Sequence, residues 1–173
     1  LKKETKIIHI SSDCVFDGVH GNYSEVSKNY TNDFYGLSKK FGEYKKFKNL
    51  INIRTSVIGN EVSSKNGLLN WFLNQKSEIT GFKNVFFSGL TTNEFAKIVA
   101  DIFNQNKLYN KRLIHIGGTK ISKYQLLKIL NSIYKKKIKI KISKKERLDR
   151  SLNSMYFYKK FNYKPKTWNA LIK

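Results

Sequence analysis

A tyrosine and a lysine, Tyr35 and Lys39, stand four residues apart in the segment FYGLSKKFGE. When a hydride reduces a carbonyl carbon, the oxygen needs a proton, and a phenol can give it. A free phenol has a reference pKa near ~10, which is high for exchange at neutral pH. An ammonium one helical turn away lies on the same face and favours the phenolate. A general acid positioned in this way typically contributes ~10²–10⁴-fold to a rate.

The spacing alone is weak evidence, because three other pairs share it: Tyr44/Lys48, Tyr124/Lys128 and Tyr156/Lys160. In a chain rich in both residue types, most such pairs are solvated neighbours on a helix surface. Tyr35 differs in its surroundings. It follows a predicted strand whose carboxyl end carries Ser11, Ser12 and Asp13, and open α/β sheets bind their ligands at the carboxyl ends of strands.

The first third of the chain reads as strand, loop, helix and strand. We predict a buried strand over Thr5–Ser12, a loop over 18–32, a helix over Phe34–Phe47 capped by Asn32 or Asp33, and a buried strand over Leu50–Gly59. Short apolar runs rich in β-branched residues indicate strands that are covered on both faces. This order is typical of a parallel sheet covered by helices.

The rest of the chain is less regular. We predict helices over Gly67–Gln75, Thr91–Gln105, Ser122–Tyr134 and Trp168–Ile172, and strands over Val85–Gly89, Arg112–Gly118 and Lys137–Ser143. The fold class is therefore α/β, with part of a Rossmann-type parallel sheet and a smaller α+β region. We assign residues 1–60 to the sheet domain and 61–173 mostly to the second region, with returns to the sheet allowed.

Composition narrows the functional classes. The net charge of +22 comes mostly from lysine spread along the chain, which we interpret as compositional drift at solvated positions. Arginine, the residue suited to bidentate phosphate and base contacts, is scarce, so no nucleic-acid partner is expected. No apolar run is long enough to span a membrane. Cys14 is the only cysteine and the histidines are isolated, so we expect no disulfide and no metal, and a reducing cytoplasm.

Three ordered motifs resemble one known family. SSDCVFDG, YGLSKKFGE and NIRTSVIG are similar to segments of the extended short-chain dehydrogenase/reductases, nearest to the dTDP-4-dehydrorhamnose reductases and related sugar-nucleotide reductases. FFSGLTTNEFAKIV and HIGGTKISKYQLLKIL extend the resemblance over most of the chain. The implied activity is NADPH- or NADH-dependent reduction of a nucleotide-linked 4-keto sugar in polysaccharide precursor synthesis. A homodimer is an expectation for the complete enzyme.

The resemblance also implies roles for particular residues. Ser12, Tyr35 and Lys39 would be catalytic, and Ser11, Tyr35 and Lys39 would contact the cofactor. Ser12, Asp13, Arg54 and Val57 would contact the nucleotide-diphosphate sugar. Two of these have equal structural alternatives, since Asp13 could cap a turn and Arg54 could serve as an ion-pair partner at a strand end.

The sequence departs from the family pattern in two places. The proline and asparagine that often precede the tyrosine are missing from TNDFY, and Val57 replaces an aromatic residue. No glycine-rich G-x-x-G-x-x-G or G-x-G-x-x-G turn occurs, so we expect a chain that lacks most of the cofactor-binding half and is inactive and poorly soluble alone. Three alternatives stay open: an epimerase or dehydratase of the same family, a non-catalytic sugar-nucleotide-binding protein, and a basic nucleic-acid-binding module.

Overall fold

The structure, a computed structural model, describes residues 5–44, 46–61, 67–105 and 111–173. Its first sheet has the strand order β1 (Ile7–Ser12), β2 (Leu50–Thr55) and β6 (Leu113–His115), all parallel. Ser12 pairs with Thr55 in register, and Arg54 pairs with both Ser11 and His115. The carboxyl ends of the three strands therefore meet at one edge, which confirms the predicted α/β class with a parallel sheet.

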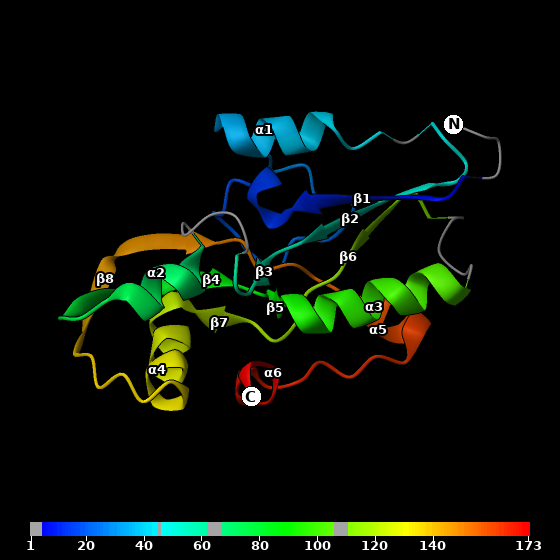
Figure 1. The fold of residues 1–173 in the computed structure, drawn as a ribbon. Coiled ribbons are helices and arrows are strands. Elements are labelled where there is room, and N and C mark those ends of the chain that lie inside the picture. Colours follow the sequence, from blue (N-terminus) through cyan, green and yellow to red (C-terminus); the bar gives the residue numbers. More distant parts are fainter. Residues whose placement is uncertain (1–4, 45, 62–66, 106–110) are drawn as a thin grey trace.

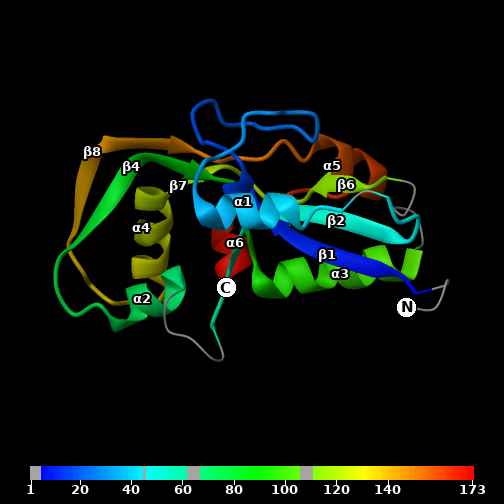
Figure 2. The ribbon, with the colours of Figure 1, turned by 90° about the horizontal axis from the view of Figure 1, so that it is seen from above.

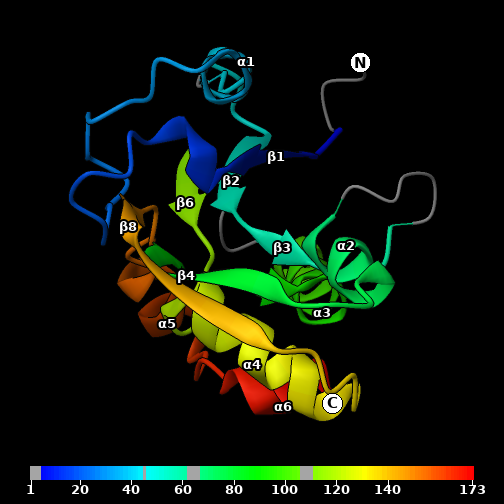
Figure 3. The ribbon, with the colours of Figure 1, turned by 90° about the vertical axis from the view of Figure 1, so that its left-hand side faces the viewer.

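Helices cover the two faces of this sheet. Helix α1 (Phe34–Phe41) lies on one side, and α3 (Thr92–Gln105) and α5 (Met155–Phe161) lie on the other (Figures 1 and 3). The amphipathic pattern of α3 directs Ile98 and Ile102 toward the sheet, where they join Ile53 and Phe157 in one buried cluster. Burial of such side chains contributes roughly 1.5–3 kcal/mol each.

The second region lies beyond the carboxyl edge of the sheet (Figures 1 and 2). Its strand β4 (Ile79–Phe87) pairs antiparallel with β7 (Ile121–Ser122) and parallel with β8 (Ile140–Asp149). A core of aliphatic residues with Phe72, Phe87 and Trp168 joins these strands to α2 (Leu68–Asn74), α4 (Lys123–Ile133) and α6 (Trp168–Ile172). The short strands β3 (Val57–Ile58) and β5 (Leu90–Thr91) pair with each other in a separate parallel sheet.

Several predictions of element type or extent were wrong. Strand β1 is not buried on both faces: within the described residues it pairs only with β2, and Ile10 is 38% exposed. Helix α1 ends at Phe41 rather than Phe47, because Glu43 turns inward to meet Arg54. The predicted strand Leu50–Gly59 breaks at Ser56, whose carbonyl accepts the N–H of Leu90. Strands β4 and β8 extend beyond the predicted ranges Val85–Gly89 and Lys137–Ser143, and no element was predicted where helix α5 lies.

Candidate active site

Ser12 lies at the last position of β1 and caps a short 3₁₀ turn, η1 (Asp13–Val15). Its Oγ accepts the N–H of Cys14 at 3.1 Å and donates to Asp13 Oδ1 at 3.3 Å. The hydroxyl is therefore held at the carboxyl edge of the sheet by its own turn. This is the place where the sequence predicted a ligand-binding edge.

Gly36 brings helix α1 onto that turn. A Cβ atom at Gly36 would lie 2.2 Å from the carbonyl oxygen of Cys14, so only glycine permits the observed approach. Asp33 caps the helix, and its Oδ1 accepts the N–H of Gly36 at 2.7 Å. The capping residue and the close contact together fix the first turn of α1, which carries Tyr35, against the turn that follows Ser12.

Tyr35 and Lys39 lie beside each other at this edge. The Lys39 Nζ is 5.9 Å from the centre of the Tyr35 ring, and Tyr35 is 56% exposed. Within the described residues, the Tyr35 hydroxyl makes no hydrogen bond, to Ser12 or to any other group. Lys128 lies at the same 5.9 Å from the ring of Tyr124, so the lysine–tyrosine distance does not distinguish the two pairs. What separates them is the contact of α1 with the Ser12 turn.

Asp13 is buried directly beside Ser12. Burial raises the pKa of its carboxyl group, and this is partly offset by the Cys14 thiol, which donates to Oδ1 at 3.6 Å, and by the charges of Lys123 and Arg150. Burial also lowers the pKa of Lys123, the first residue of α4, while Asp13 acts in the opposite direction. Lys123 and Arg150 of the second region thus act electrostatically on the carboxyl group in the turn after Ser12.

Arg54 lies in a buried network beneath the edge, and the structure favours the structural alternative for it. Its side chain is fully buried, and Nε and Nη2 donate to the Glu43 carboxylate at 2.6 and 2.7 Å. The hydroxyl of Ser11 donates to the same carboxylate at 2.8 Å. Burial by itself would raise the pKa of Glu43, but the hydrogen bonds and charge of Arg54 together with Ser11 bring it below its usual value. Ser11 and Arg54 thus face Glu43, while Val57 is 44% exposed on β3.

His115 completes the network in its neutral form. Its Nδ1 donates to the carbonyl of Tyr23 at 2.9 Å, which leaves Nε2 to accept from Arg54 Nη1 at 3.3 Å. Burial, followed by the charge of Arg54, lowers the pKa of His115 to about 3. The residue is packed inside the sheet, as expected for a histidine in an apolar strand.

This shift predicts a pH dependence of stability. The unfolded state takes up a proton near the ordinary histidine pKa of about 6.5, and the folded state does not do so until about pH 3. The contribution of His115 to the free energy of unfolding is therefore fully present above pH 6.5. Below that pH it falls by on the order of 1 kcal/mol per pH unit. Urea unfolding at pH 7 and pH 5 should show the loss in the wild type and a smaller one in His115→Gln. His20→Gln, at an exposed position, is the control, and an equal loss in His115→Gln and wild type would contradict the prediction.

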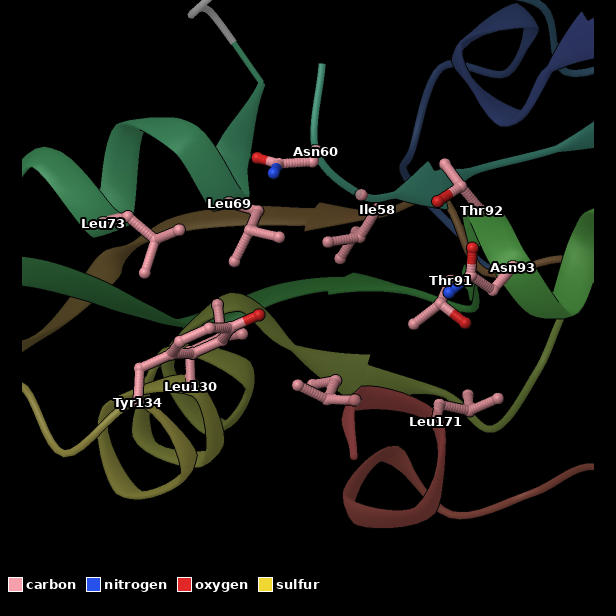
Figure 4. Close-up of a pocket in the computed structure, with 12 residues that line it drawn as sticks. Ile58, Asn60, Leu69, Leu73, Thr91, Thr92, Asn93, Leu130, Tyr134 and Leu171 are labelled. Atoms are coloured by element: carbon pink, nitrogen blue, oxygen red, sulfur yellow. The ribbon is translucent and has the colours of Figure 1, made fainter. Parts of the chain in front are cut away.

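A cavity of about 390 Å³ lies away from these groups (Figure 4). It is lined by Leu69 and Leu73 of α2, Leu130 of α4, Tyr134 directly after α4, and Thr92 at the start of α3. None of the predicted site residues lines it. The lining includes the phenol of Tyr134 and the hydroxyls of Thr91 and Thr92, but none of the residues that the sequence motifs select, so we keep the candidate active site at the edge that carries Ser12 and the helix of Tyr35.

Sequence reasoning missed several residues that shape this edge. Glu43 stood in the motif YGLSKKFGE, and a carboxylate just after a helix could have been paired with the buried arginine of the next strand. Lys123 and Arg150 carry no sequence signal, because only the folding of the second region brings them to the turn. Thr55 Oγ1, in register with Ser12, is buried and has no hydrogen-bond partner in the described chain.

The described residues contain neither a metal-ligand cluster nor a membrane-spanning helix. Residues 5–44, 46–61, 67–105 and 111–173 contain no group of three or more His, Cys, Asp or Glu residues that could hold a metal ion. Over the same ranges, no helix combines the length and apolar character that crossing a bilayer requires.

The chain is similar in sequence and in fold to known proteins. A family profile described as RmlD substrate binding domain matches residues 1–169. A solved structure of a hypothetical dTDP-4-dehydrorhamnose reductase from Sulfolobus tokodaii is 26% identical with a TM-score of 0.75, over 90% of this chain and 58% of that one. A dTDP-4-dehydrorhamnose reductase from Clostridium acetobutylicum is 18% identical with a TM-score of 0.83, over 98% and 64%.

A third similar structure is dTDP-4-dehydrorhamnose reductase from Bacillus anthracis in complex with NADP, 17% identical with a TM-score of 0.82, over 96% of this chain and 63% of that one. The chain thus spans about three fifths of the length of these solved structures. No protein among the curated sequences is significantly similar to it.

Proposed function

Because the chain belongs to the RmlD substrate binding domain family, we propose that it takes part in NAD(P)-dependent reduction of a nucleotide-linked 4-keto sugar for polysaccharide precursor synthesis. The observation that carries the proposal is the contact of Gly36 with the Cys14 carbonyl, because it brings the helix of Tyr35 and Lys39 onto the turn that follows Ser12. We assign the reaction to the cytoplasm, and a homodimer stays a prediction.

In this proposal the three side chains have different tasks. Ser12 turns its hydroxyl proton from Asp13 Oδ1 to the substrate carbonyl oxygen, and Tyr35 gives that oxygen its proton. Lys39 favours the phenolate and holds the nicotinamide ribose. Bound NADPH or NADH supplies the hydride. The Tyr35 hydroxyl is suited to this part because it is exposed and has no hydrogen-bond partner among the described residues.

The remaining predicted residues are proposed either to contact a ligand or to support the residues that do. Asp13 and Val57 are proposed to contact the nucleotide-diphosphate sugar, and Ser11 the cofactor. Arg54 is fully buried against Glu43, so we propose that any influence on the substrate runs through its neighbours at the strand ends. Residues 1–60 would belong to the cofactor-binding unit, and residues 61–173 mostly to the substrate-binding region, with β6 returning to the first sheet.

Net cofactor consumption tests the proposal. With the complete enzyme, the absorbance of NADPH and of NADH at 340 nm is followed after addition of dTDP-4-dehydrorhamnose, and calorimetry measures the binding of dTDP-rhamnose. We expect net oxidation of one cofactor and binding of the product. An epimerase or dehydratase would convert a sugar nucleotide without net oxidation, and a non-catalytic binding protein would bind without turnover. Either result would contradict the proposal.

A further inference from the structure

The cap of helix α1 is joined to the C-terminal part of the chain by one ion pair. Arg150 Nη2 donates to Asp33 Oδ2 at 3.2 Å, while Asp33 Oδ1 accepts the N–H of Gly36 at 2.7 Å. Asp33 stands two residues before Tyr35. Arg150 therefore contacts the carboxylate that determines where the helix of Tyr35 begins.

The segment around Arg150, residues 149–154, holds the loop that leads into α1, and we call it the strap. On the loop side, the N–H of Asp149 donates to Gly18 O at 2.6 Å, and Tyr23 and Ser151 are joined by a 2.9 Å bond from the Tyr23 N–H. The N–H of Asn153 donates back to Tyr23 O at 2.7 Å.

The other side of the strap is fixed to the second region. The N–H of Arg150 donates to Phe86 O on β4 at 3.1 Å, and the N–H of Leu152 donates to Ser88 Oγ at 2.8 Å. The strap thus connects β4 to the loop before α1 through hydrogen bonds on both of its sides. Within it, the Arg150 side chain is the one that contacts the helix cap.

The surroundings of Arg150 place it between the two halves of the candidate site. Its charge reaches Asp13 and Cys14 in the turn after Ser12, and its guanidinium contacts Asp33 ahead of Tyr35. The Nε atom is buried without a hydrogen-bond partner in the described chain. The position of the side chain therefore does not satisfy all of its hydrogen-bond donors. Asp33 is 46% exposed in this pair, and exposed pairs stabilise a fold little, so overall stability does not explain the contact.

We propose that Arg150 is a positioning residue that, through Asp33, sets the first turn of α1 and hence the place of Tyr35 relative to Ser12. The functional importance of Arg150 rests on the proposed catalytic role of Tyr35. The coupling between residue 150 and the first turn of α1 can be measured without cofactor or substrate.

The test is nuclear magnetic resonance of the protein with Arg150→Met, using Arg147→Met as the matched control. Arg147 is an exposed arginine on β8, outside the strap. Arg150→Met should speed exchange of the Gly36 amide by roughly three- to tenfold and shift the Tyr35 ring resonances, which are assigned by their loss in Tyr35→Phe. Arg147→Met should leave both at wild-type values, and Arg150→Lys should restore most of the wild-type Tyr35 signals.

A second variant separates the cap from the ion pair. Asp33→Ser keeps a capping hydroxyl but cannot form the ion pair, so it should reproduce the Tyr35 shift. In the Asp33→Ser background, Arg150→Met should have no further effect. Wild-type Tyr35 signals in Asp33→Ser, or an undiminished effect of Arg150→Met in that background, would overturn the proposal. Because no turnover is measured, a missing reductase activity would count against the proposed function and leave this test intact.

Discussion

In the complete enzyme, replacing Tyr35 by Phe should slow net NAD(P)H oxidation by at least about 100-fold, because the proton donor to the carbonyl oxygen is lost. The ring and its packing remain, so the binding of dTDP-rhamnose should change by less than about threefold. The rate with saturating dTDP-4-dehydrorhamnose and the calorimetric binding constant are the two measurements. A loss of rate without a loss of binding is the signature of an interaction made only in the transition state.

The matched control is Tyr124→Phe. Tyr124 has its own lysine at the same distance on a helix, Lys128 at 5.9 Å from the ring, but α4 does not contact the Ser12 turn through a glycine. Its replacement should leave the rate nearly unchanged, and so should Tyr156→Phe. A loss at Tyr124 comparable to the loss at Tyr35 would show that proximity of a lysine, and not position at the sheet edge, had been the relevant property.

Local patterns predicted the elements that position Tyr35. The apolar run before Ser12, the capping Asp33 and the glycine next to Tyr35 are all signals carried by short segments, and each one has its place in the structure. Helices α3 and α4 were likewise readable from their stripes of Ile and Leu. Where periodicity or turn chemistry was strong, the element type followed from it.

Other features depended on distant residues. The exposure of β1 depends on how many neighbours the strand has, and the early end of α1 depends on the attraction between Glu43 and Arg54. Arg150 reaches Asp33 across 117 positions of the chain. A local sequence pattern carries no information about contacts between distant residues, so the strap and the buried network could not be predicted from residue spacing.

Replacing Arg54 by Met should lower the free energy of unfolding by about 3–5 kcal/mol, because the buried Glu43 carboxylate loses its counter-charge. Urea unfolding at pH 7 is the measurement. The control is Lys141→Met, which breaks an ion pair with Glu78 in which the lysine is 62% exposed and should cost no more than about 1 kcal/mol.

A double variant tests whether charge burial is the cause. Arg54→Met combined with Glu43→Leu removes both charges and refills the space, so it should recover much of the loss, since apolar replacement of a buried pair is often neutral. If Arg54 acts mainly by direct contact with a substrate phosphate, Arg54→Met should instead be as stable as Lys141→Met and weaken dTDP-rhamnose binding. Stability lost by Arg54→Met and regained in the double variant would assign Arg54 to the support of α1, because Glu43 lies directly after that helix and receives both the arginine and the hydroxyl of Ser11.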